Sequence, residues 1–350
     1  MNVDLRSRAC NAMFGLALGD ALSWPAMFHR SYLLPFWTRR IRREIEAATE
    51  NTNALPLAMP FSLNRSDQVF LPGPTDDSEW AAFTMQQLLQ AQGELEAESL
   101  LKSWLLLAES DNIRGSIGIQ AALQNLRKGK SAPTCGYDNP HYFDDGALCR
   151  AVPIGIANAG NPQMAADMAA IDAQITNAED GLWAAKAMAA AISTACIGHS
   201  SESVIAHARA ELPENSWINR TVQQALSLCE TSESTFELIP LLHETIINRE
   251  YNYGNIAPET MALTLAILRH TQGQFEAAVM MATTFAKTAD SVPACAGALC
   301  GAMTNQAILT PLWQERLRAL HGICIPALAG VNFIDLVEQL AGLAVARSAA

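Results

Sequence analysis

The chain has 350 residues, of which 50% are hydrophobic and 17% are charged. This apolar fraction is enough to bury a large core, and it excludes a chain that is disordered throughout. The net charge of −12 arises from 35 acidic and 23 basic side chains. Because nucleic-acid affinity depends on basic side chains that displace phosphate counterions, this balance argues against DNA or RNA as a general partner.

Cysteine usage and apolar patterning predict a cytoplasmic protein. The eight cysteines include no C-x-x-C pair and fall mostly in apolar stretches, so we expect them to be reduced and buried. The apolar run from Ala9 to Leu18 is closed by Asp20, without the cleavage site of a secretion signal. No stretch approaches the roughly 18 uncharged apolar residues that a membrane span requires, so we expect no membrane association.

Apolar residues recur at helical spacing along most of the chain, and convincing alternating strands are absent. The pattern predicts an all-α fold, a single compact bundle of many helices joined by short turns. The expected helices are 4–22, 39–50, 77–92, 97–109, 115–128, 146–159, 163–175, 179–197, 215–230, 234–248, 257–270, 273–286, 291–303 and 331–347.

The segment 24–74 interrupts this pattern, because it is rich in proline and contains only one plausible helix. A segment of this length inside a compact domain is usually functional, often as a lid or a loop that faces the substrate. No shift in composition marks a linker. We therefore predict one domain over residues 1–350, with a Pro-rich loop or lid insertion at 24–74.

The sharpest local pattern is Thr75-Asp76-Asp77-Ser78, at the start of the expected helix 77–92. One interpretation is a helix cap, since a threonine or aspartate there satisfies free backbone N–H groups and complements the helix dipole. A cap, however, needs one side chain, whereas three adjacent oxygen donors lie here. Hard cations such as Mg²⁺ bind clustered oxygens of this kind. The pattern alone leaves both interpretations open.

A second acidic position, Asp290-Ser291, precedes the small-residue run 292–302. Alanine and glycine recur there at helical spacing, so this helix can approach a neighbour closely. Here too, a cap and a metal ligand are both possible.

A third feature is the acidic loop that ends at Asp145-Gly146 and leads into a helix with one basic residue, Arg150. The start of that helix could hold a phosphate through its backbone N–H groups. The alternative is a capped helix with a solvated arginine. His141 lies four residues before Asp145 in the same loop, which makes it a candidate for substrate contact.

Taken in order, four segments resemble motifs of the ADP-ribosylglycohydrolase family. The family motif G-L-A-x-G-D-A-L-G resembles 15–23, and T-D-D-T/S matches 75–78. The motif N-G-A-x-x-R-x-x-P-L-G resembles 145–155, and G-G-D-T-D-S/T with the following small residues resembles 286–301. Four motifs in the same order are much more specific than any one of them.

The resemblance implies an all-α orthogonal bundle that cleaves a bond at the anomeric carbon of ribose with Mg²⁺. One or two ions are expected, and Mn²⁺ could replace Mg²⁺. Asp76 and Asp77 are the candidates for accepting a proton from water. The resemblance assigns metal binding to Thr75, Asp76, Asp77, Asp290 and Ser291, and substrate binding to Asp20, Asp145, Gly146, Arg150 and His141.

This sequence also departs from the family motifs. The first aspartate of D-T-D is Thr288 here, and Lys287 replaces a glycine, so one carboxylate is lost and one cation is gained. An acidic family position falls at Met27, the asparagine of N-G-A is Asp145, and a histidine position is Asn177. The extra charge at Asp145 would disfavour a nearby diphosphate unless a cation such as Lys287 compensates for it.

These observations favour a metal-dependent N- or O-glycosyl hydrolase that acts on a ribosyl-type substrate. ADP-ribosyl compounds come first and smaller nucleoside-like glycosides second, so the expected partner is a small molecule or an ADP-ribosylated substrate. The alternative is a non-catalytic protein that binds ADP-ribose or a nucleotide through a degraded metal site. Thr75, Asp76, Asp77 and Asp290 favour the enzyme, whereas Thr288 and Met27 favour the alternative. The sequence does not indicate the leaving group or the oligomeric state.

Overall fold

The computed structural model of the protein describes residues 2–30, 73–248, 254–285 and 287–349; within the first helix, it describes the side chains of residues 4–22. All regular elements in these ranges are helices, and the only β-type pairings there are two isolated bridges, Asp144 with Ile256 and Ala319 with Asn332. The all-α prediction is confirmed.

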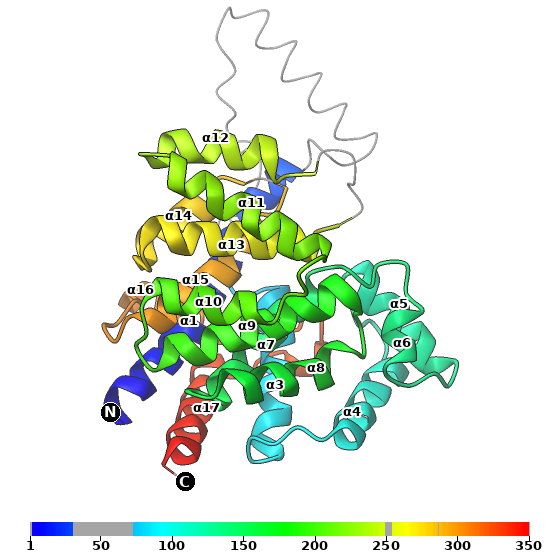
Figure 1. Cartoon of the computed structure of the whole chain (residues 1–350). Coiled ribbons are helices and arrows are strands. Elements are labelled where there is room, and N and C mark those ends of the chain that lie inside the picture. Colours follow the sequence, from blue (N-terminus) through cyan, green and yellow to red (C-terminus); the bar gives the residue numbers. More distant parts are fainter. Residues whose placement is uncertain (1, 31–72, 249–253, 286, 350) are drawn as a thin grey trace, which may run out of the picture.

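The helices are α1 (Asn2–Arg30), α3 (Asp76–Gln90), α4 (Ala97–Glu109), α5 (Ile117–Arg127), α6 (Thr134–Tyr137), α7 (Gly146–Ala157), α8 (Pro162–Ala173), α9 (Glu179–Cys196), α10 (Ser201–Ala210), α11 (Trp217–Thr231), α12 (Thr235–Thr245), α13 (Ala257–Thr271), α14 (Phe275–Ala282), α15 (Val292–Met303), α16 (Pro311–Arg316), the 3-10 helix η2 (Pro326–Leu328) and α17 (Phe333–Ser348). Figure 1 shows α12, α11 and α13 stacked at one end of the molecule, with α9 and α7 near its centre and α4, α5 and α6 on one side.

The antiparallel crossing of α1 and α15 organises the part of the fold that matters for function. A Cβ atom on Gly15 would lie 2.1 Å from the carbonyl oxygen of Gly297, and one on Gly19 would lie 2.0 Å from that of Pro293. Neither position can therefore carry a side chain without moving a backbone. The crossing brings the C-terminal half of α1 beside the start of α15.

The structure differs from the expected helices at the end of α1 and at α10. The first helix continues beyond residue 22 to Arg30, past Pro25, although a proline usually ends or kinks a helix. Helix α10 was not expected, although it begins with a clear cap in which Ser200 Oγ accepts a hydrogen bond from the Ser203 N–H. The expected helix 39–50 and most of the expected lid lie outside the described residues.

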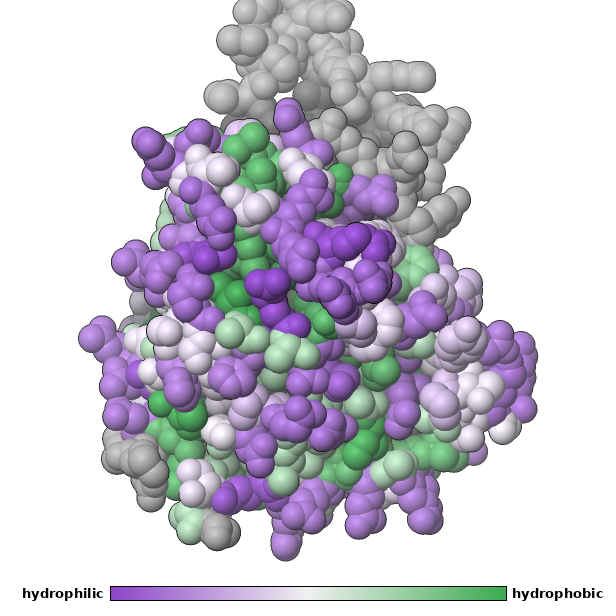
Figure 2. All heavy atoms as spheres, viewed as in Figure 1, coloured by the Kyte–Doolittle hydropathy of each residue, from purple (hydrophilic) through white to green (hydrophobic). Residues whose placement is uncertain are grey.

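The core is built from alanine, leucine and isoleucine on the inner faces of these helices. All eight cysteines are free thiols, and all except the half-buried Cys229 are buried, as expected. Figure 2 shows a mainly hydrophilic face on which hydrophobic side chains form small, scattered groups. No helix in the described part of the chain is long and apolar enough to span a membrane.

Candidate active site

The starts of five helices surround one cavity of about 320 Å³. These are the N-terminal ends of α3, α5 and α7 and the residues that lead into α13 and α15. The lining residues are Asp76, Asp77, Trp80, Gly115, Ser116, Ile117, Ile119, His141, Asp144, Asp145, Gly146, Cys149, Gly254, Asn255, Asp290 and Ser291. The predicted residues Asp76, Asp77, His141, Asp145, Gly146, Asp290 and Ser291 are thus brought together.

At three of these helix starts, the residue in the N-cap position does not cap its own helix. The side chains of Thr75, Asp145 and Ser291 form no capping hydrogen bond with α3, α7 and α15, respectively. Polar residues at the starts of other helices do cap them, as Asn161 and Ser216 do for α8 and α11. The simple cap interpretation therefore fails at all three positions.

Thr75 is held by Asp20, a residue of α1. The Asp20 carboxylate accepts hydrogen bonds from the backbone N–H groups of Thr75 and Ser78, at 2.7 and 3.0 Å, and from both hydroxyl groups. Asp20 is fully buried and does not line the cavity. The structure thus gives Asp20 a role in fixing the start of α3, and its predicted contact with substrate stays a prediction.

Asp77 is the most strongly perturbed carboxylate of the cavity. The residue is 9% exposed, and its buried Oδ2 accepts no hydrogen bond from the described residues. Burial raises the pKa of Asp77 well above its usual range, and the negative charges of Asp76, Asp20, Asp290 and Asp145 raise it further. Such a site favours either a proton or a bound cation.

Asp145 and Asp144 are adjacent but have different partners. Burial raises the pKa of Asp145 to about 6, although Thr260 Oγ1 donates a hydrogen bond of 2.6 Å to its Oδ2. Asp144 instead accepts hydrogen bonds from Ser116 Oγ at 2.6 Å and from the Gly118 N–H at 3.0 Å. Asp144 therefore attaches the start of α5 to the cavity, while Asp145 is bonded to α13.

Asn177 hydrogen-bonds to the loop that contains Asp144. Its Nδ2 donates hydrogen bonds to the carbonyl oxygen of Asp144 at 2.9 Å and to Asp144 Oδ1 at 3.0 Å. At this position, where the family resemblance expects a histidine, the side chain is structural and does not line the cavity.

Arg150 lies in the core and does not reach the cavity. Its Nε donates to Asp172 Oδ2 at 2.7 Å, Nη2 donates to Thr176 Oγ1 at 2.7 Å, and Nη1 donates to the Gly146 carbonyl at 2.9 Å. The guanidinium also lies over the ring of Trp104, 5.1 Å from its centroid. The fully buried guanidinium is thus bonded within the protein, and the predicted contact of Arg150 with substrate stays a prediction.

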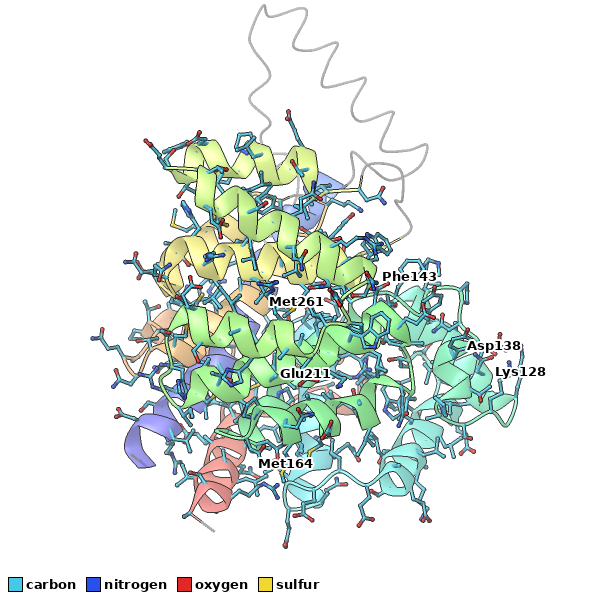
Figure 3. The ribbon with its side chains drawn as sticks, in the orientation of Figure 1. Lys128, Asp138, Phe143, Met164, Glu211 and Met261 are labelled. Atoms are coloured by element: carbon cyan, nitrogen blue, oxygen red, sulfur yellow. The ribbon has the colours of Figure 1, made fainter. Side chains whose placement is uncertain are left out.

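His141 lies beside an aromatic group. Its ring is 6.1 Å from that of Phe143, which in turn lies 6.0 Å from Trp217 at the start of α11. Figure 3 labels Phe143 beside that end of α11. His141 thus contributes a ring to a cavity wall that is otherwise mostly acidic or small.

Four further residues that the sequence does not mark as site residues line the cavity: Ser116, Asp144, Gly254 and Asn255. Asn255 Nδ2 donates a hydrogen bond of 3.0 Å to Ser291 Oγ and so joins the wall before α13 to the start of α15. Asp144 could have been suspected, because it adjoins Asp145; Ser116 and Asn255 belong to no motif.

The donor set has the chemistry of a hard-cation site. Carboxylates and hydroxyl groups are the ligands that Mg²⁺ prefers, and Asp77 Oδ2 is buried without a hydrogen-bond donor. No three histidine, cysteine, aspartate or glutamate side chains of the described residues already form a group that could hold an ion. Because Mg²⁺ usually keeps several waters and binds through one or two carboxylates, these residues still fit such an ion.

Comparisons with known proteins agree with the fold. The profile of the ADP-ribosylglycohydrolase family matches residues 1–348. A solved structure titled "ADP-ribosylglycohydrolase-related protein complex" is 21% identical, with a TM-score of 0.61 and 99% coverage of both chains. No curated protein matches the chain.

The family profile defines a hydrolase of the glycosidase class, and the all-helical fold agrees with it. The chain belongs to the ADP-ribosylglycohydrolase family. The predicted family and the prediction of a hydrolase are confirmed.

Proposed function

We propose that this hydrolase depends on a divalent cation, Mg²⁺ or Mn²⁺, and cleaves the anomeric bond of ADP-ribosyl or related ribosyl and nucleoside-like substrates. The observation that supports this most directly is Asp77 Oδ2, a buried carboxylate oxygen without a hydrogen-bond donor, in a cavity shared with Asp76, Asp145 and Asp290. Clustered carboxylates in a low-dielectric cavity repel one another, so a bound cation would stabilise them.

The cation would be held by Thr75, Asp76, Asp77, Asp290 and Ser291, at the starts of α3 and α15. Hydrogen bonding by Asp20 supports the role of Thr75, because a hydroxyl that donates to Asp20 keeps its lone pairs available as a ligand. When bound, the ion would polarise sugar hydroxyl groups and neutralise the carboxylates.

The protein's own groups would orient the sugar and accept the proton of the attacking water. We assign proton acceptance to Asp76 and Asp77, which line the cavity. Asp145, Gly146 and His141 would contact the substrate from the wall formed by α7 and the loop before it. As the glycosidic bond breaks, positive charge develops on the sugar ring, and the surrounding carboxylates stabilise it.

We also infer a cytoplasmic location from the free cysteines, because thiols of this number are typical of reducing compartments.

The proposal is tested by hydrolysis of a substrate panel that runs from ADP-ribosyl-arginine through ADP-ribosyl-serine to simple ribonucleosides. Each substrate is offered with Mg²⁺, with Mn²⁺ and with a chelator. We expect turnover of at least one substrate with either metal and none with the chelator. Equal turnover in the chelator would contradict the metal requirement, and tight ADP-ribose binding without cleavage of any substrate would favour the binding-protein alternative.

A further inference from the structure

A buried ion pair joins two segments of the chain that lie next to cavity-lining residues. Lys287 Nζ donates to both carboxylate oxygens of Glu259, each at 2.7 Å. The two side chains are only 6% and 2% exposed. Neither residue lines the cavity, and neither belongs to the set of residues proposed to bind metal or substrate.

Each partner is connected to a different wall of the cavity. Lys287 lies in the turn that leads to Asp290 and Ser291, at the start of α15. Glu259 is in the first turn of α13, and its Oε1 also accepts a hydrogen bond of 2.6 Å from the Asn248 N–H. Glu259 thus bonds to Asn248 and lies four residues after Asn255, which lines the cavity.

The two walls also meet directly. Asn255 Nδ2 donates a hydrogen bond to Ser291 Oγ at 3.0 Å. This contact depends on the relative position of the two segments that the ion pair joins. A change in that position would shift Ser291, and with it Asp290, relative to Asp77 across the cavity.

We propose that Lys287 and Glu259 are a positioning pair that sets the spacing of the cavity walls and thereby its affinity for a divalent cation. The cation itself rests on the proposed function. The pair acts on the site through Asn255 and Ser291.

Stability alone does not explain why charged residues occupy these two buried positions. Two charges lose their hydration when they are buried, so apolar residues of similar volume often stabilise a protein equally well or better. The ion pair instead fixes the relative position of the two segments, because its hydrogen bonds are directional and join the ammonium to both carboxylate oxygens. Groups that hold the ligands of a metal site typically change its affinity by 10–100-fold when they are altered.

The test compares Lys287→Met, Glu259→Gln and the double variant with wild type. Each single change leaves a buried group without its partner, so both single variants should be less stable. The double variant contains no unpaired charge, and the glutamine oxygen can still accept from the Asn248 N–H. We expect its unfolding midpoint to return close to that of wild type. Lys287→Arg, which keeps the charge, should preserve most of the wild-type behaviour.

Two measurements separate positioning from stability. Amide hydrogen exchange should be faster, by about tenfold or more, in peptides covering 254–260 and 287–295 of the double variant. Mn²⁺ affinity, measured by electron paramagnetic resonance, should be weaker by about tenfold or more. Lys186→Met is the matched control, because it breaks the ion pair of Lys186 with Glu211, which lies between α9 and the end of α10. It should change neither quantity.

Wild-type exchange and wild-type Mn²⁺ affinity in the double variant would overturn the proposal, because the pair would then contribute only stability. If wild-type protein binds no Mn²⁺, the proposed metal dependence fails, and with it the claim about cation affinity. The exchange measurement then still decides whether the pair positions the walls.

Discussion

The carboxylate of Asp20 in α1 accepts a hydrogen bond of 2.7 Å from the backbone N–H of Thr75, so α1 supplies the cap for α3. The same carboxylate accepts from the N–H of Ser78 and from the hydroxyl groups of Thr75 and Ser78. Because Asp20 does the capping, the side chains of Asp76 and Asp77 are left to face the cavity. A buried carboxylate outside the cavity thus determines the geometry inside it.

Asp20→Ala should therefore destabilise the protein. The change removes the acceptor of the buried N–H and hydroxyl groups of Ser78 and of the partly buried N–H of Thr75, and each unsatisfied buried group costs about 1–3 kcal/mol. We expect the free energy of unfolding to fall by about 3 kcal/mol or more, measured by urea denaturation. As a control, Asp335→Ala removes an exposed carboxylate in α17 and should cost less than about 1 kcal/mol. Equal losses in the two variants would contradict this role of Asp20.

A second prediction tests whether Arg150 stabilises the core or contacts the substrate. Arg150→Met removes the partner of the buried Asp172 carboxylate, so we expect a loss of about 3–5 kcal/mol in the free energy of unfolding. Adding Asp172→Leu removes the unpaired charge and should recover much of that loss. A stable Arg150→Met variant with a raised KM would instead show that Arg150 contacts substrate.

Much of the fold could be predicted from the sequence, because helical periodicity is a strong and local signal. Helix α9, for example, runs over Glu179–Cys196 where 179–197 was expected. The end of α1 could not be predicted, since Pro25 is a usual stop signal and only the surrounding structure decides whether a helix continues past it. Helix α10 is short, and its buried face consists of only a few residues, including Val204 and Ile205, which makes its period hard to recognise.

The candidate site was predictable only where a motif marked it. Asp77 and Asp145 belong to two of the motifs and line the cavity. Arg150, in the same motif as Asp145, and Asp20, in the first motif, are buried and do not line it. A sequence motif gives the residue types only. It does not show which side chains line the cavity and which hydrogen-bond to the residues that do. The pairing of Lys287 with Glu259 could not be predicted from the sequence either. The two residues are separated by 28 positions, and only the packing of α13 brings them together.

The raised pKa values predict an unusual pH dependence for the metal-free protein. The pKa of Asp145 is about 6 in the folded protein and lies near 3.9 in an unfolded chain. Between these values, the folded state binds more protons than the unfolded state, so stability falls as pH rises from about 4 to about 6. Asp20, with a pKa of about 6, contributes in the same direction.

Chemical denaturation in the presence of a chelator, at a series of pH values from 4.5 to 7.5, measures this dependence. Asp145→Asn keeps an oxygen that can accept from Thr260 Oγ1 and removes one titrating group, so its pH dependence should be shallower than that of wild type. Addition of Mg²⁺ should raise stability most at the upper end of the range, where the carboxylates are charged. Stability that rises with pH through this window in both proteins would contradict the assignment.

Asp77→Asn is predicted to separate catalysis from folding most sharply. The folded protein raises the pKa of Asp77, so the ionised carboxylate opposes folding when no cation is bound. Asparagine has nearly the same shape and no charge. In a chelator at pH 7, the free energy of unfolding of the variant should therefore equal or exceed that of wild type.

The rate of hydrolysis, in contrast to stability, should fall in the Asp77→Asn variant. Loss of the Asp77 carboxylate removes a proposed metal ligand and a proposed proton acceptor, and we expect turnover to fall by about two orders of magnitude or more. The increase in melting temperature that Mg²⁺ gives to wild type should also shrink, because that increase depends on binding to the folded state. Asp167→Asn, a change at an exposed carboxylate of α8, should leave turnover and the effect of Mg²⁺ unchanged. An Asp77→Asn variant that is clearly less stable than wild type in the chelator, yet retains full turnover, would show that this carboxylate supports the fold and not the reaction.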